Sequence, residues 1–278
     1  MLDIGIEFPE KKPYLNIGCG PNYSHDWFNI DSASGNSDVI VYNILSGLPF
    51  RNDSLEVIYS SHVLEHLREE EAIRLLQECF RTLKKGGILR IVIPDLEDII
   101  DEYLRLRKSL SEDPSNEIIA LKYKWILLEM FDQPSRNYTG GQMKEFIQSD
   151  GVKIEEYIKN RLGSIADELF ETGRKVPMAN GKENFSFLKI IKRLINKIRL
   201  SDREKELIAT GKFRESGEVH FWMYDKVSIK RLLTGMNFSS VSFMTAITSN
   251  IKDWEFYNLD IVNNKILHRS SIFVEAVK

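Results

Sequence analysis

Residues 14–21 read YLNIGCGP, a short apolar run followed by two glycines with one residue between them. An apolar run that ends in turn residues predicts a β-strand entering a tight loop. Gly18 and Gly20 lack side chains, so a ligand can approach the backbone of this loop closely. Nucleotide-like cofactors commonly bind at the C-terminal ends of parallel strands, where this loop would lie. A plain turn can also contain two glycines, so the rest of the chain has to decide between these interpretations.

Strand-like and helix-like segments alternate from this loop to about residue 107. Further strands are predicted at 27–31, 39–42, 55–59 and 88–93. Apolar residues recur at a helical period from Val63 to about Lys85, and Gly86-Gly87 is expected to cap that helix. This alternation predicts an α/β fold with a parallel sheet covered on both faces.

The pattern changes after residue 107. As far as residue 215 the sequence is mostly helical in its periodicity, charged and interrupted by prolines, and strand signals return at 237–244 and 271–277. We therefore expect residues 1–107 and 216–278 to form one α/β domain. Residues 108–215 are expected to form a helical insertion within it.

The overall composition excludes several classes of protein. A net charge of −3 on 278 residues provides no basic field that would attract nucleic acid. Cys19 and Cys79 belong to no zinc-ligand pattern. The N-terminal segment lacks the features of a signal peptide, and no apolar stretch is long enough to span a bilayer. We expect a cytoplasmic protein that does not bind nucleic acid.

An acidic residue at the end of the second predicted strand narrows the choice of cofactor. The carboxylate of Asp31 can accept hydrogen bonds from both hydroxyls of a ribose. Tyr23 stands where the dinucleotide fingerprint G-x-G-x-x-G has its third glycine. A pyrophosphate on a helix N-terminus needs that glycine for close packing, whereas S-adenosylmethionine has no phosphate. The loop therefore favours S-adenosylmethionine over NAD.

Several segments, taken in order, resemble the class I S-adenosylmethionine-dependent methyltransferases, and in particular the type 11-like group. They are residues 15–21, 27–31 and 48–50, the stretch SHVLEHL at 61–67, and LKKGG at 83–87. The resemblance covers roughly the first third of the chain. It implies a Rossmann-like, mostly parallel sheet of seven strands in the order 3-2-1-4-5-7-6, with the last strand antiparallel. The segment between Pro21 and Trp27 is too short for the usual first helix, so that helix is expected to be abbreviated or missing.

The resemblance also implies an activity and a set of cofactor-binding residues. The activity is methyl transfer (EC 2.1.1.-) to a small molecule or a glycan, with oxygen as the expected acceptor atom and the insertion as a lid on the acceptor side. The implied cofactor residues are Gly18, Cys19, Gly20 and Pro21 at the methionine part, Asp31 and Ser32 at the ribose, Asn43 and Ile44 at the adenine, and Ser60, Ser61 and His62 beneath the sulfonium. Relatives often have Asp where Asn43 stands, and an amide can still form a hydrogen bond there.

Three of the five histidines are candidates for the base that would deprotonate a hydroxyl. His62 and His66 are four residues apart and would share one face of a helix, although His62 could simply pack against the cofactor. His220 lies in the stretch VHFWMYD at 219–225. Together with GGQ at 140–142, this stretch resembles a substrate-side element of methyltransferases linked to cell-surface polysaccharide synthesis. In the alternative interpretation, Trp222 and Tyr224 are core aromatics and Asp225 caps the next helix.

Two further stretches bear on whether the chain binds a metal ion or a membrane. His62, Glu65 and His66 resemble a carboxylate-x-x-Glu-His set that binds a divalent ion in some related enzymes, but His62 replaces the first carboxylate, so we expect no metal. Residues 185–200 interleave apolar and basic residues at helical spacing. Such a helix can contact an anionic membrane surface, which would suit a lipid-linked glycan acceptor, or it can pack as an ordinary helix, lid or dimer contact.

Two other functions fit parts of this pattern. The first is an NAD-dependent sugar-modifying oxidoreductase, which the missing third glycine and the lack of a suitably placed Tyr-x-x-x-Lys pair oppose. The second is a non-catalytic protein with a degenerate cofactor site. The presence of Gly18, Gly20 and Asp31 opposes degeneration.

Overall fold

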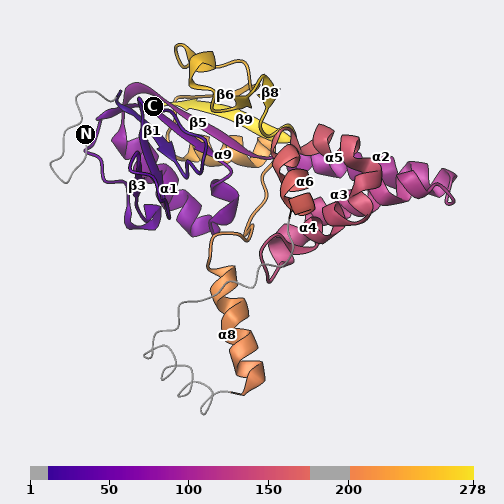
Figure 1. The fold of residues 1–278 in the computed structure, drawn as a ribbon. Helices are drawn as coiled ribbons and strands as arrows, with labels where there is room; N and C mark the ends of the chain where they lie inside the picture. Colours follow the sequence, from indigo (N-terminus) through magenta and orange to yellow (C-terminus); the bar gives the residue numbers. More distant parts are fainter. Residues whose placement is uncertain (1–11, 176–200) are drawn as a thin grey trace.

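One central sheet of seven strands organises the computed structural model, which describes residues 12–175 and 201–278 (Figure 1). Its strands are β1 (Tyr14–Ile17), β2 (Phe28–Asp31), β3 (Val39–Val41), β4 (Leu55–Ser61), β5 (Leu83–Pro94), β6 (Ser240–Met244) and β9 (Ser271–Val277). They lie in the order β3-β2-β1-β4-β5-β9-β6, and β9 runs antiparallel to both neighbours. The predicted order 3-2-1-4-5-7-6 is confirmed, because β9 is the seventh strand of this sheet. The short strands β7 (Ile261–Val262) and β8 (Lys265–Ile266) pair separately as a hairpin.

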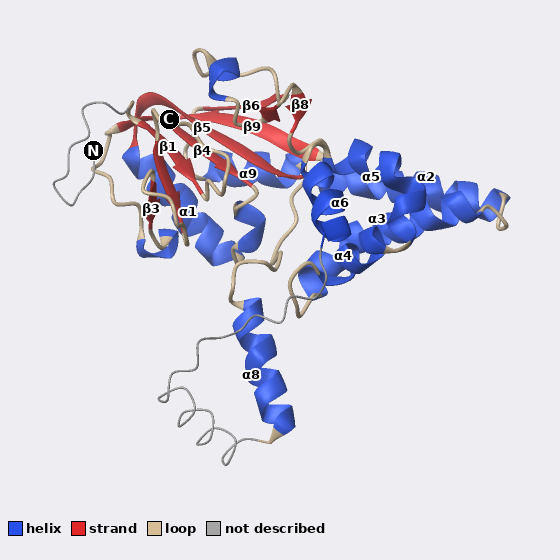
Figure 2. Ribbon diagram, viewed as in Figure 1, coloured by secondary structure: helices blue, strands red, loops and turns tan. Residues whose placement is uncertain are grey.

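Helices cover one face of the sheet and form a lobe beside it (Figure 2). They are α1 (Glu69–Thr82), α2 (Leu96–Glu112), α3 (Glu117–Ser135), α4 (Gly141–Gln148), α5 (Glu155–Leu162), α6 (Ile165–Lys175), α8 (Asp202–Arg214) and α9 (Lys226–Gly235), with the 3-10 helices η1 (Ile44–Ser46), η2 (Leu64–His66), η3 (Asp150–Ile154) and η4 (Trp254–Tyr257). The expected domain boundary at 107–108 lies within α2. The basic stretch 185–200 lies outside the described residues.

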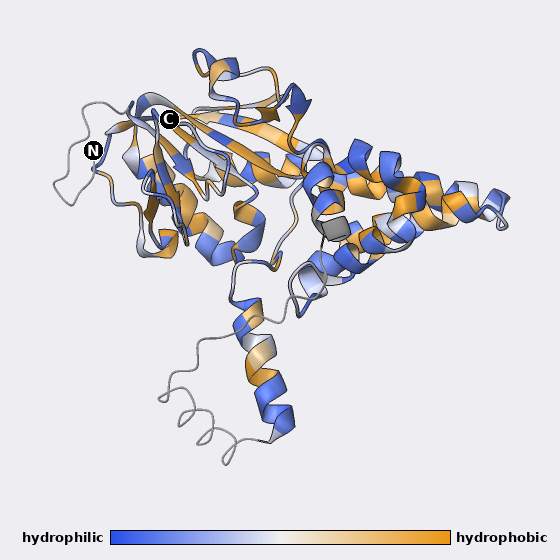
Figure 3. Ribbon diagram, in the orientation of Figure 1, coloured by the Kyte–Doolittle hydropathy of each residue, from blue (hydrophilic) through white to orange (hydrophobic). Residues whose placement is uncertain are grey.

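Both faces of the sheet are buried, because successive residues of a strand point to opposite sides. Leu15 and Ile58 belong to the apolar core beneath α1 and α9. Trp27 and Tyr59 belong to a second core on the other face, where Trp254 of η4 covers them. The central strands are largely hydrophobic, as burial on both faces requires (Figure 3). As expected from the short β1–β2 connection, the described residues 21–27 form no helix.

The helix predicted from Val63 to Lys85 is shorter than expected at both ends. It begins at Glu69, where the extended Arg68 backbone N–H donates to Glu71 Oε2 at 2.9 Å. It ends at Thr82, because Leu83 is fully buried and pairs with Leu55 at the start of β5. The prediction that Gly86-Gly87 caps the helix was therefore wrong, since both glycines lie inside β5.

The helical lobe, α2 to α6, has its own apolar core around Trp125 and Phe146. Backbone hydrogen bonds connect this lobe to the β7–β8 hairpin and to the segment that follows it. The Ser164 N–H donates to the Ile266 carbonyl at 2.9 Å, and the Ser270 N–H donates to the Arg161 carbonyl at 3.0 Å. These bonds hold the start of α6 near the end of the sheet where the predicted cofactor loop lies. Among the described residues, no helix has the length and apolar character needed to cross a bilayer.

Candidate functional site

The loop after β1 adopts the tight turn that its glycines predict. Gly18 and Gly20 have φ of 62° and 52°, in the left-handed region that disfavours side chains. The Gly20 N–H donates to Asp31 Oδ2 at 2.8 Å, and the Ser32 hydroxyl donates to Asp31 Oδ1 at 3.2 Å. Asp31 therefore fixes the loop against the end of β2. Asp31 is only partly buried and lines a cavity, so its carboxylate is accessible to a ligand.

Replacing Gly18 with alanine should destabilise this loop. A Cβ at Gly18 would lie 2.3 Å from Val63 Cγ2, and the left-handed backbone adds strain of about 1–2 kcal/mol. We expect the free energy of unfolding in urea to fall by more than about 1 kcal/mol. Gly35→Ala is the matched control, because its Cβ would meet nothing within 4 Å and its backbone is not left-handed. Equal stability of the two variants would contradict this account of the loop.

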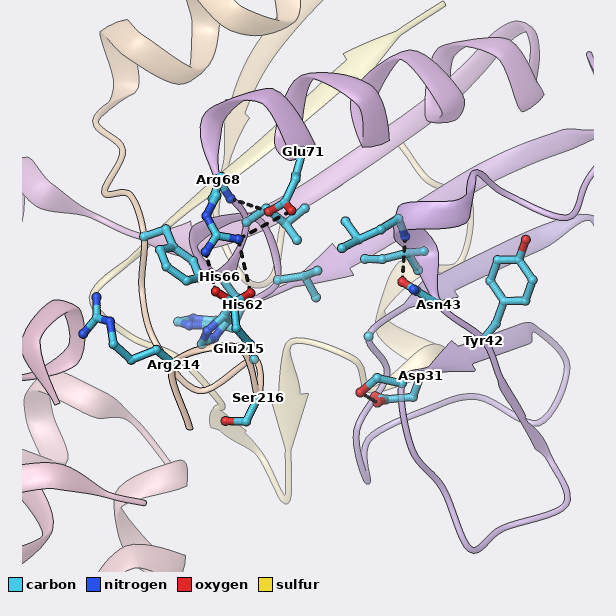
Figure 4. A pocket seen from close by; sticks show the side chains of 18 of the residues that line it. Asp31, Tyr42, Asn43, His62, His66, Arg68, Glu71, Arg214, Glu215 and Ser216 are labelled. Atoms are coloured by element: carbon cyan, nitrogen blue, oxygen red, sulfur yellow. Dashed lines mark hydrogen bonds and ion pairs between the residues drawn. The ribbon is translucent and has the colours of Figure 1, made fainter. Parts of the chain in front are cut away.

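A cavity of about 660 Å³ opens beside the ends of β1 to β4 (Figure 4). It is lined by Gly18, Asp31, Ser32, Val41, Tyr42, Asn43, Ile44, Leu45, His62, Val63, His66, Leu67, Arg68, Glu71, Arg214, Glu215, Ser216, Gly217 and Phe221. The predicted ribose and adenine residues thus come together in one place. Asn43 Oδ1 accepts the Leu45 N–H at 3.0 Å and so starts η1, which shapes this end of the cavity.

A second cavity, of about 780 Å³, lies on the other side of the glycine loop. It is lined by Asn16, Gly18, Cys19, Gly20, Pro21, Asn22, Tyr59, Ser61, His62, Ser164, Ile165, Asp167, Glu168, Glu171, Leu259, Val262, Asn263, Lys265, Leu267 and His268. Gly18 and His62 line both cavities and therefore lie where the two meet. Of the predicted cofactor residues, Ser60 lines neither cavity, because it is buried in β4 between Ile17 and Ile91.

His62 stands at this junction in an unusual conformation. Its φ of 53° places a non-glycine residue in the left-handed region, directly after β4. Nδ1 lies 3.0 Å from Glu65 Oε1, and Nε2 lies 3.1 Å from Ser271 Oγ. The ring stacks on His268, with 3.8 Å between the ring centroids. Strained residues held by several neighbours are common at functional sites, because the surrounding structure has to maintain them.

His66 contacts His220 and its neighbour Val219, which lies 153 residues further along the chain than His66. Their rings are perpendicular, with centroids 4.5 Å apart. His66 Nδ1 lies 3.2 Å from the Val219 carbonyl oxygen, and the Phe221 N–H donates to the Glu65 carbonyl at 2.8 Å. These contacts return the chain to η2 after the insertion. All three predicted catalytic histidines therefore lie in one cluster.

The other residues of the 219–225 stretch have mixed outcomes. Tyr224 is buried in the core, and Asp225 caps α9 by accepting the Ser228 N–H at 2.6 Å, as the alternative interpretation expects. Trp222 is 48% exposed, so in this respect the alternative interpretation, in which it is a core aromatic, does not hold. In the GGQ stretch, Gly140 starts α4 and the Gln142 N–H donates to Asp132 Oδ1 at 2.7 Å.

Burial controls the charge of the histidine cluster. It lowers the pKa of His62 to about 4 and raises the pKa of Glu65 to about 7. It also lowers the pKa values of His220 and His268, with nearby histidines adding to the effect. The imidazoles of His62, His220 and His268 are therefore neutral at neutral pH, and each has one ring nitrogen with a lone pair.

Sequence reasoning missed His268 and Ser271. Ser271 is the first residue of β9 and His268 lies just before that strand, and this position at the start of the last predicted strand was the only local signal. The side chains that lie close enough to share a metal ion also differ from the metal-ligand set that the sequence suggests. They belong to Glu65, His66 and His220 rather than to His62, Glu65 and His66.

Residues 30–91, from β2 to β5, match the family model described as "Methyltransferase domain". This segment contains Asp31, Asn43 and the stretch from His62 to His66 after β4. The strand order and the antiparallel β9 agree with that match. The chain has a class I methyltransferase fold.

Solved methyltransferase structures resemble this chain at low sequence identity. A S-adenosylmethionine-dependent methyltransferase from Archaeoglobus fulgidus is 13% identical, with 98% of this chain and 88% of that chain covered and a TM-score of 0.39. A possible histamine N-methyltransferase from Thermotoga maritima is 11% identical, with 99% and 86% covered and a TM-score of 0.36. One from Methanosarcina mazei is 22% identical over 35% of this chain and 61% of its own, with a TM-score of 0.27. A search among curated proteins gave no match. Similarities this low identify no acceptor.

Proposed function

We propose that this methyltransferase transfers a methyl group from S-adenosylmethionine to a hydroxyl group of a small molecule or a saccharide. The observation that carries this proposal is the position of His62, which lines both cavities and whose imidazole is kept neutral by burial. Methyl transfer to a hydroxyl needs a donor and an acceptor aligned at one point and a group that removes a proton there. The junction at His62 meets both requirements.

The adenosine part of the cofactor fits the first cavity. A carboxylate offers about four lone-pair positions, so Asp31 can bind a ribose while it still accepts the Gly20 N–H. Asn43 Oδ1 is already used by Leu45, which leaves the amide nitrogen to donate to a ring nitrogen of adenine. The methionine part would then extend along Gly18 to Gly20, with the sulfonium towards His62.

The acceptor is assigned to the second cavity, where the helical insertion contributes Ser164, Ile165 and the acidic start of α6. Residues of the β7–β8 hairpin close the opposite side. In this arrangement the insertion is the acceptor-side lid. Binding there excludes water from the methyl group, which strengthens every polar interaction around the reacting atoms.

His62 is proposed as the base. In the tautomer with its proton on Nδ1, which lies 3.0 Å from Glu65 Oε1, His62 has a lone pair on Nε2 that would face Ser271 Oγ. An acceptor hydroxyl that takes the place of the Ser271 hydroxyl would give its proton to Nε2 as its oxygen attacks the methyl carbon. The carboxylate of Glu65 would stabilise the imidazolium that results. S-adenosylhomocysteine then leaves as the second product.

The His62→Asn variant tests this role. We expect S-adenosylhomocysteine production from sugar nucleotides or glycan intermediates to fall by about 10²–10⁴-fold, the usual contribution of general-base catalysis. His25→Asn is the matched control, because His25 pairs with Asp38 on the exposed surface. Full turnover by the His62 variant would contradict the assignment of the base.

Isothermal titration with S-adenosylhomocysteine and with NAD distinguishes the proposed function from its two alternatives. Binding of S-adenosylhomocysteine without NAD supports the proposal. Binding of NAD alone would favour the oxidoreductase, and binding of neither compound would favour a non-catalytic protein. The same purified protein can then be screened with candidate acceptors.

A further inference from the structure

Three side chains that can bind a metal meet at the end of β4. One ligand atom from each of Glu65, His66 and His220 lies within 4.8 Å of the other two. Glu65 is fully buried, His220 is 6% exposed, and His66 is partly exposed. Around a zinc ion with bonds of about 2.0–2.1 Å, ligand atoms lie roughly 3.3 Å apart. Small side-chain rotations would bring these three atoms to that spacing.

Glu65 is the least expected member of this group. Both carboxylate oxygens are buried, and neither accepts a hydrogen bond from any residue that the structure describes. His62 Nδ1 lies 3.0 Å from Oε1, but it does not meet hydrogen-bond geometry. A buried carboxylate without a partner is costly, so such groups are normally paired, hydrogen-bonded or bound to a metal. A bound cation would give the Glu65 carboxylate the partner that it lacks among the described residues.

The contacts around His66 also suit a metal ligand. Its Nδ1 faces the Val219 carbonyl oxygen at 3.2 Å. A carbonyl can only accept, so the proton is on Nδ1 and the lone pair is on Nε2. Metal-binding histidines almost always donate their other ring N–H to a carbonyl or carboxylate in this way. The backbone bond from Phe221 to Glu65 at 2.8 Å holds His220 beside the same point.

We propose that Glu65, His66 and His220 bind one divalent transition-metal ion such as Zn²⁺. Two imidazoles and one carboxylate form a nitrogen and oxygen donor set that suits this class of ion better than Mg²⁺. Three protein ligands leave at least one coordination position open. This proposal departs from the expectation that the chain binds no metal, and its ligand set has His220 in place of His62.

The three proposed ligands lie beside the proposed reaction site. His66 lines the first cavity, while His220 lines a smaller cavity that it shares with His62 and Ser271. An acceptor oxygen bound to the ion would lose its proton more readily, because a metal lowers the pKa of a bound hydroxyl. This role in the reaction rests on the proposed function, whereas metal binding itself does not.

The test uses the full chain, purified without a histidine tag and freed of metal with a chelator. Titration with Zn²⁺ is expected to show one equivalent bound, and Co²⁺ should give the intense visible absorption of a four- or five-coordinate nitrogen and oxygen site. Glu65→Gln and His220→Asn should each weaken Zn²⁺ binding by more than about 100-fold, because even residues that only orient metal ligands contribute 10–100-fold. His25→Asn is the matched control and should bind Zn²⁺ as the unchanged chain does, because His25 pairs with Asp38 on the exposed surface.

Three results would overturn the proposal. They are the absence of saturable Zn²⁺ binding, unchanged binding in the Glu65 and His220 variants, and equal loss in the His25 control. Circular dichroism checks that the variants fold. Where a variant does not fold, the Co²⁺ spectrum of the unchanged chain decides, since a weak six-coordinate spectrum indicates surface binding alone. S-adenosylhomocysteine titration of the same samples reports separately on the cofactor, so failure of the metal site and failure of the proposed function are distinguishable.

Discussion

Replacing Asp31 with alanine is expected to weaken S-adenosylhomocysteine binding by at least about 100-fold. The carboxylate would lose two hydrogen bonds to the ribose hydroxyls, each contributing about 1.5–3 kcal/mol because the acceptor is charged. A loss of about 3 kcal/mol already corresponds to more than 100-fold in the dissociation constant. The Gly20 N–H would also lose its acceptor, so the loop would be less ordered before the cofactor binds. Isothermal titration measures the change directly.

Two variants make this result specific. Asp26→Ala removes an exposed carboxylate from the same β1–β2 connection, away from the cavity residues, and should leave the affinity unchanged. Asp31→Asn keeps the Gly20 contact but loses the charge, so its affinity should fall between those of Asp31→Ala and the unchanged chain. Unchanged affinity in Asp31→Ala would mean that the ribose lies elsewhere.

The parts of the fold that follow from local sequence could be predicted. Short apolar runs predicted the first five strands, and the resemblance predicted their order. The helix after β4 was placed wrongly at both ends, because tertiary contacts decide where it begins and ends. Leu83 fits the helical period, but it pairs with Leu55 and extends β5 backwards. Periodicity alone cannot distinguish these two positions for a buried leucine.

The candidate site divides in the same way. Gly18, Gly20, Asp31 and Asn43 each follow a predicted strand, so their convergence follows from the parallel sheet. The neighbours of His62 could not be predicted, because the antiparallel pairing of β9 with β5 brings in the residues around Ser271. The contact between His66 and His220 could not be predicted either. It depends on hydrogen bonds between residues on either side of the insertion, and a local sequence pattern does not show these.

Arg90 is a further residue that the sequence did not reveal. It stands within the apolar run of β5 and is fully buried. Its guanidinium donates to Asp260 Oδ2 at 2.7 Å and to Glu275 Oε1 at 2.7 Å. It also donates to the carbonyl oxygens of Thr245 at 2.8 Å and Thr248 at 3.1 Å. One arginine therefore links β5 to β9 and to the segment that covers the second face of the sheet.

Replacing Arg90 with methionine is expected to lower the free energy of unfolding by about 3–5 kcal/mol, the usual cost of breaking a buried ion pair from one side. Asp260 is 3% exposed and Glu275 is 1% exposed, so neither carboxylate could be solvated without moving its segment. Methionine fills much of the same space, so the loss reports on charge rather than on a cavity. Urea unfolding measures it. Lys84→Ala is the control, because the exposed pair of Lys84 with Glu56 should contribute less than about 1 kcal/mol.

A double variant shows whether unpaired charge is the cause. Adding Asp260→Asn to Arg90→Met removes one of the two stranded carboxylates, so part of the lost stability should return. A double variant less stable than the sum of its single changes would contradict this explanation, since residues in one network should show favourable coupling. Asp260 also precedes the β7–β8 hairpin, whose residues line the second cavity. Arg90→Met should therefore reduce methyl transfer in the fraction that remains folded, because the acceptor side of the site would lose its support from the sheet.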